Sequence, residues 1–168
     1  RYGFGLALTY AHPPDLERAK EEIESALMLD PRFAAAHLTM GWIRQQLESF
    51  EVGHGWLEQA VDSFSSAEDL LDSKNATDGE LWAAAQLNKG HALFALGKND
   101  AAFKAFLQRE LSGVPFETSV VESLFRESFA RVALALEEYD VALDMAHLAH
   151  RQTARRKGAT AALVAAIH

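Results

Sequence analysis

The chain has 168 residues, 49% of them hydrophobic, which is enough to bury a sizeable core in one domain or one short repeat array. Its formal net charge of −8 and its isoelectric point near 5.3 argue against a general nucleic-acid or anionic-membrane surface, because both need a concentrated basic face. The absence of cysteine excludes disulfides, thiolate catalysis and cysteine-ligated zinc.

The first third of the chain predicts three helices. Glycine and proline are sparse along the chain, and two of the four prolines lie in "HPPD". A second helix follows over "LERAKEEIESALMLDP", with apolar residues at helical spacing. Asp30 before Pro31 is a helix-start signal, so a third helix is expected to begin at once.

The middle of the chain continues the helical pattern. In "WLEQAVDSFSSAEDLL" the apolar residues recur at steps of one, three and four, which places them on one stripe of a helix. Thr77 with Glu80 and Ser119 with Glu122 have the spacing of a capping box and predict two further helix starts. No stretch shows a strand pattern, so we expect an all-α fold.

The spacing of small residues resembles the tetratricopeptide repeat (TPR) family. Ala19, Ile23 and Ala26 precede Pro31 by twelve, eight and five residues, as in the second helix of a TPR. Later stretches fit the same frame less regularly, with Gly41 and Gly90 at the small position of the first helix. The resemblance implies a right-handed superhelix of antiparallel helix pairs, an α-solenoid of about four repeats.

On this frame residues 1–168 form a single TPR-like domain. The repeats are approximately 1–33, 34–82, 83–122 and 123–157, and 158–168 is a partial or capping helix. The second repeat carries an insert near "ESFEVGH". The chain does not begin with methionine, and we expect it to be part of a longer protein.

The frame also predicts how the paired helices pack. Small residues are expected where two helices approach most closely, and larger ones are expected to fill the gaps between repeats. The close-approach residues on the first helices are Ala7, Gly41, Gly90 and Ala130; their partners on the second helices are Ala19, Ala60, Ala102 and Ala142; the gap-filling residues are Tyr10, Phe64, Phe106 and Tyr139.

No residue pattern points to catalysis. His147 and His150 lie three apart on a predicted helix, and Asp144 is the nearest third ligand, but we interpret both as surface histidines near a helix end. The cluster from Arg151 to Lys157 has the same interpretation, with a phosphate or acidic-partner site as the alternative. We expect no enzyme activity, no cofactor and no metal.

The resemblance further implies that the first helices line a concave groove for an extended peptide or a partner helix. Trp42 and Phe94 would be aromatic anchors or would pack under the inserts or between repeats. Glu127 with Arg131 would select charge or simply pair along their helix. The groove positions are Leu38, Thr39, Trp42, Gln45, Gln46, Leu87, Asn88, His91, Phe94, Glu127, Ser128 and Arg131, with Phe4 and Leu8 at the corresponding places of the first repeat.

The expected partner is therefore a protein or peptide, with no nucleic acid and no membrane insertion. Asn88 alone matches the residues with which some family members hold a C-terminal carboxylate, so an apolar or mixed peptide fits better. Self-association through terminal repeats is also open. The alternatives are a peptide- or ligand-sensing domain of a bacterial regulator and a structural arm of a larger enzyme. The compartment is undetermined, with the cytoplasm slightly favoured.

Overall fold

The computed structural model describes residues 1–11, 13–50, 53–72, 76–116 and 118–151. Over these ranges all the regular structure is helical, which confirms the predicted all-α class. No helix in the described ranges combines the length and the apolar character needed to cross a membrane. The expected terminal helix 158–168 and most of the basic cluster lie outside the described residues.

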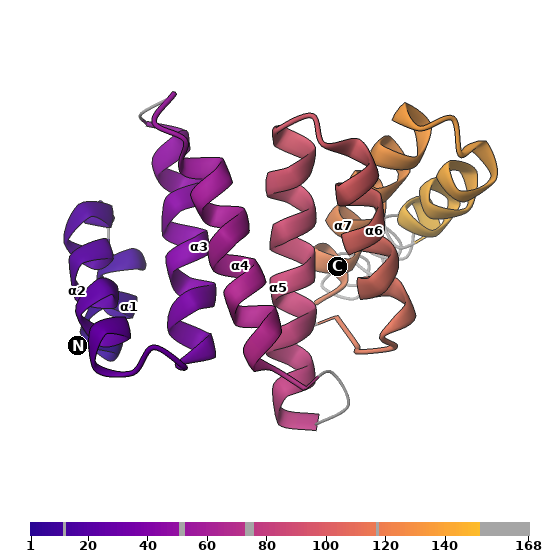
Figure 1. The fold of residues 1–168 in the computed structure, drawn as a ribbon. Coiled ribbons are helices and arrows are strands. Elements are labelled where there is room, and N and C mark those ends of the chain that lie inside the picture. Colours follow the sequence, from indigo (N-terminus) through magenta and orange to yellow (C-terminus); the bar gives the residue numbers. More distant parts are fainter. Residues whose placement is uncertain (12, 51–52, 73–75, 117, 152–168) are drawn as a thin grey trace, which may run out of the picture. The chain divides into compact units, whose positions relative to one another are not determined.

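The chain forms two compact units, one from Arg1 to Val114 and one that begins at Pro115. Each helix of the first unit packs against the next one in sequence, as in an α-solenoid, and α3 also contacts both α1 and α5 (Figure 1). The helices of this unit are α1 (Tyr2–Thr9), α2 (Leu16–Leu29), α3 (Ala34–Glu48), α4 (Trp56–Leu70), α5 (Ala76–Ala95) and α6 (Asn99–Leu111).

Two glycines set the closest helix approaches in the first unit. A Cβ added to Gly41 of α3 would lie 2.5 Å from the ring of Phe64 on α4, and one added to Gly90 of α5 would meet the ring of Phe106 on α6. Both rings are fully buried, and Phe64 also packs with Ala92 of α5. The predicted close approach at Gly41 and Gly90 is confirmed, and Phe64 joins its own helix pair to the next.

The TPR-based alignment misplaces the close-packing residue of α1 by two positions. Ala7 and Tyr10 are exposed, whereas Gly5 is buried against the side chain of Ile23 and the backbone of Ala19. The helix ends at Thr9, because Pro13 and Pro14 lie in the connection to α2 and their rings cannot enter a helix interior. The close-packing residue therefore comes two positions earlier than predicted.

Two helix starts also differ from the predictions. Asp30 does not cap α3: it follows the last residue of α2, and its Oδ1 accepts a hydrogen bond from the amide of Arg32, so that α3 begins only at Ala34. At α7 (Ser119–Ala135) the cap is Thr118, whose hydroxyl accepts from the amide of Val121. A side-chain acceptor therefore lies near each of these helix starts. Asp30 lies about one turn before the first residue of α3, and Thr118 lies one residue before the predicted cap, Ser119.

The second compact unit contains α7 and a helix over residues 139–151. The buried apolar residues of α7 are Phe125, Phe129, Val132 and Ala133, and the rings of Phe125 and Phe129 lie 5.8 Å apart. Tyr139 is largely exposed, so its predicted role as a gap filler is wrong for the described structure.

Gln86 of α5 is fully buried, and neither its amide nitrogen nor its amide oxygen has a hydrogen-bond partner among the described residues. An unsatisfied buried polar group costs about 1–3 kcal/mol. We expect Gln86→Leu to raise the free energy of unfolding by an amount of this order, measured by urea denaturation. The half-buried Gln45→Leu is the control, and a loss of stability in Gln86→Leu would show that the buried amide is satisfied in solution.

Candidate functional site

Helices α1, α3 and α5 of the first unit line an open cavity of about 170 Å³. Each contributes side chains because α3 contacts both of its neighbours. The volume is below the roughly 300–1,000 Å³ of typical small-molecule sites, so the cavity suits a single side chain. The lining residues are Leu6, Thr9 and Tyr10 of α1 and its cap, Leu38, Thr39 and Trp42 of α3, and Asn88 of α5.

Two aromatic rings form one wall of this cavity. Tyr10 and Trp42 stack with their ring centroids 6.5 Å apart and an angle of 26° between the planes. Trp42 is half-buried and packs against the apolar core of α2 and α3, whereas the side chain of Tyr10 is 73% exposed. The Trp42 ring is therefore held by the core, and the Tyr10 ring is accessible to a partner. Binding against these rings would lose little side-chain conformational entropy.

The polar lining residues are held by their own helices. The Thr39 hydroxyl donates to the carbonyl of Ala35 at 2.9 Å, and the Thr9 hydroxyl donates to that of Leu6 at 2.6 Å. The Asn88 amide nitrogen donates to the Ala84 carbonyl at 2.9 Å. These bonds fix the side chains. The Thr39 oxygen also lies 3.4 Å from the Tyr2 hydroxyl, so the oxygens of Thr9 and Asn88 are the acceptors left for backbone amides of a ligand.

The structure brings together only some of the predicted groove residues. Leu38, Thr39, Trp42 and Asn88 line the cavity, while Gln45, Gln46, Leu87 and Phe94 are half-buried outside its lining. Glu127, Ser128 and Arg131 belong to α7 in the other compact unit. The predicted set is therefore divided between two parts of the chain.

Sequence reasoning missed the contribution of α1 to the cavity. Phe4 and Leu8 were the expected positions, but Phe4 lies under the guanidinium of Arg18 at 5.2 Å and Leu8 packs against the core. Leu6 and Thr9 line the cavity instead, and Leu6 lies two residues before the expected Leu8, the same shift as that of Gly5 from Ala7. The signal was the buried glycine on α1, because Gly5 aligns this helix with Gly41 and Gly90.

His91 lies at the contact between α5 and α6 and not in the cavity lining. Its ring meets that of Phe106 edge-on, with centroids 5.3 Å apart. Burial lowers the pKa of His91 below its ordinary value, because the protonated ring is poorly solvated there. The histidine is therefore neutral in the folded protein at neutral pH.

This burial predicts a loss of stability in acid. Below the ordinary histidine pKa of about 6.5 the unfolded chain takes up the proton while folded His91 does not, so stability falls as pH drops until the folded pKa is passed. We expect His91→Gln to flatten the change in urea midpoint between pH 7.5 and pH 5. The exposed His54→Gln serves as the control, and an equal flattening there would contradict the assignment to His91.

The predicted charged pair of the second unit does form. Arg131 donates to the Glu127 carboxylate at 2.7 Å, with both side chains more than half exposed. The pair borders an apolar hollow of about 580 Å³ between α7 and helix 139–151, with Leu134, Tyr139 and Leu143 exposed.

No protein-family model matches the chain, and no curated protein matches its sequence significantly.

Proposed function

We propose that the chain is a TPR-like interaction scaffold that holds an extended segment of a partner protein against α1, α3 and α5. The observation that carries the proposal is the cavity beside the Tyr10 and Trp42 rings, which draws its lining from three helices that are separate in sequence. In the right-handed superhelix implied by the TPR resemblance, these helices would line the concave face.

The geometry favours a peptide over a small metabolite. The cavity has room for one side chain, and the polar groups of its lining are uncharged: the hydroxyls of Thr9, Thr39 and Tyr10, the amide of Asn88 and the indole N–H of Trp42. Such a lining fits an apolar side chain with a neighbouring backbone amide that bonds to the amide oxygen of Asn88. Tyr and Trp are the residue types that most often dominate interface energy, and here they form the wall.

Tyr10→Ala and Trp42→Ala are each expected to weaken peptide binding by about thirtyfold or more, since truncated hot-spot aromatics cost about 2 kcal/mol or more. Peptides would first be selected on the wild-type protein from a random displayed library, and their affinities then measured by fluorescence polarisation. Asn88→Ala should weaken binding less, because a single neutral hydrogen bond contributes about 0.5–1.5 kcal/mol.

Phe50→Ala is the matched control for Tyr10→Ala. Both aromatic side chains are exposed to nearly the same degree, at 72% and 73%, but Phe50 lies after α3 and outside the cavity lining. Its removal should leave the affinity unchanged. If Tyr10→Ala and Trp42→Ala bind the selected peptides as the wild type does while remaining folded, the proposed groove is wrong.

A further inference from the structure

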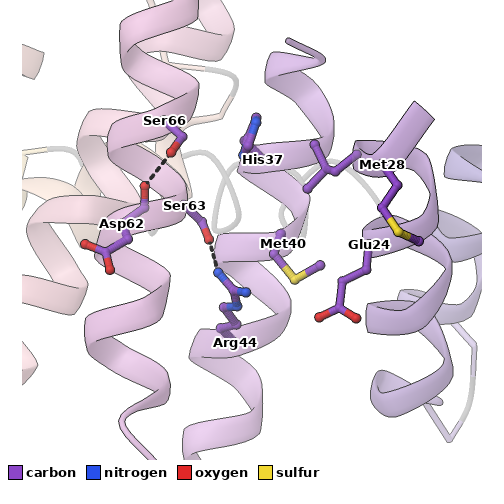
Figure 2. A pocket seen from close by; sticks show the side chains of 9 residues that line it. Glu24, Met28, His37, Met40, Arg44, Asp62, Ser63 and Ser66 are labelled. Carbon is purple, nitrogen blue, oxygen red and sulfur yellow. Dashed lines mark hydrogen bonds between the residues drawn. The ribbon is translucent and has the colours of Figure 1, made fainter. Parts of the chain in front are cut away.

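A second cavity of about 530 Å³ lies between α2, α3 and α4 in the first compact unit (Figure 2). It shares no lining residue with the cavity of Tyr10 and Trp42. The two sites use opposite sides of α3: His37, Met40 and Arg44 face this one, while Leu38 and Trp42 face the other. The volume is within the usual range for ligand sites.

The guanidinium of Arg44 lies between α3 and α4. Its Nη1 donates to the Ser63 hydroxyl at 2.6 Å and to the Gln59 carbonyl at 3.2 Å. Its Nε is buried and has no partner, and no described residue accepts a hydrogen bond from Nη2. Burial lowers the pKa of Arg44, and Glu24 and Asp62 act against that shift. The guanidinium group is thus held in place by Nη1 alone, which leaves Nη2 to donate to a carbonyl oxygen of a ligand.

Two acidic residues line the cavity from opposite sides. Glu24 comes from α2 and Asp62 from α4, and neither forms an ion pair among the described residues (Figure 2). With Arg44 as the one cation, the cavity carries one negative charge in excess. The Ser66 hydroxyl already donates to the Asp62 carbonyl, so its oxygen is an acceptor as well, whereas the Ser63 oxygen already accepts from Arg44. Acceptors therefore outnumber donors in this site.

The remaining wall is apolar and adaptable. Leu27 and Met28 of α2 and Met40 of α3 line it, and the side chain of Met28 is 77% exposed. Leu29, next to Met28, is similarly exposed, so apolar surface continues beyond the cavity. Methionine adjusts its shape to a bound group. A wall of this kind suits the aliphatic stem of a long side chain, together with an apolar neighbour.

We propose that this cavity binds a basic segment of a partner protein in which a lysine or arginine is next to an aliphatic residue. The basic head bonds to Glu24 or Asp62, its stem lies along Leu27 and Met28, and a backbone carbonyl of the segment accepts from Arg44 Nη2. A peptide supplies both the cation and the carbonyl, and so it matches the two carboxylates and the arginine together.

Methyl-labelled methionine tests the location directly. The chain contains three methionines, of which Met28 and Met40 line the cavity and Met145 lies in the other compact unit. The probe is a short peptide of alternating pairs of leucine and lysine, added to the full chain. We expect the Met28 and Met40 methyl resonances to shift saturably, while that of Met145 stays in place. A peptide with glutamine for lysine should cause no such shift.

Charge removal tests the mechanism. Glu24→Gln with Asp62→Asn is expected to weaken binding of the lysine peptide by about two- to fivefold, as the loss of one exposed ion pair would. Glu21→Gln with Asp69→Asn removes the same charge from exposed positions of α2 and α4 outside the cavity, and it should leave the affinity nearly unchanged. Equal weakening in both double variants would mean general attraction to an acidic surface and would overturn the site.

The two proposed sites can be tested independently of each other. Tyr10→Ala should leave the Met28 shift and the affinity for the lysine peptide unchanged, even though it impairs the groove of α1, α3 and α5. If Tyr10→Ala abolishes binding of the lysine peptide, or if the Met28 methyl does not respond to saturating peptide, the cavity between α2, α3 and α4 is not its site.

Discussion

Replacing Phe64 with alanine is expected to lower the free energy of unfolding by about 3–5 kcal/mol, the usual cost of truncating a buried phenylalanine. Phe64 is fully buried, its ring lies on Gly41, and it forms a cluster with Ala60 and Ala92. Gly41 and Ala92 are too small to fill the space that the ring leaves. The resulting cavity separates α4 from both α3 and α5, so two helix contacts weaken at once.

Chemical denaturation followed by circular dichroism measures this loss, with Phe50→Ala as the control. Phe50 is exposed and should change stability by no more than about 0.5 kcal/mol. In a chain whose helices contact mainly their neighbours, the damage should also be local. Hydrogen exchange is therefore expected to quicken most in α3, α4 and α5. Wild-type exchange in these helices together with unchanged stability would contradict the structural role of the ring.

The helices and their tightest contacts are predictable from the sequence because they depend on local spacing. Apolar residues at helical intervals fix the buried stripe of α4, and a glycine in the interior of α3 or of α5 indicates a close helix approach. Phe64 and Phe106 follow as the rings that use this space. Each of these inferences concerns two neighbouring helices joined by a short connection.

The parts that were not predicted depend on longer-range geometry. The position of Gly5 against Ile23 is set by where the proline-containing connection ends α1, and a two-residue change there exchanges Leu8 for Leu6 in the cavity. Arg44 looks in the sequence like one more cation on a helix. Its significance appears only when α2 and α4 bring Glu24 and Asp62 to either side of it.

Gly41→Ala is expected to be strongly destabilising, although alanine is the better helix former by about 1 kcal/mol. Three atoms of the Phe64 ring lie within 2.8 Å of where the new Cβ would be, and a carbon there cannot fit unless the ring or α4 moves. Overpacking of a tight core usually costs about 1–3 kcal/mol. The contact is closer than ordinary overpacking, so we expect a net loss at the upper end of that range, measured by urea denaturation.

Gly3→Ala is the matched control, since Gly3 is also helical but a Cβ there has no atom within 4 Å. It should leave stability unchanged or raise it by up to about 1 kcal/mol. The double variant Gly41→Ala with Phe64→Leu gives the second test. If the steric argument is right, the smaller side chain relieves part of the clash, and the double variant loses less stability than the sum of the single ones. Strict additivity would mean that Gly41 is required for another reason. In that case the close approach of α3 and α4 would not depend on the glycine.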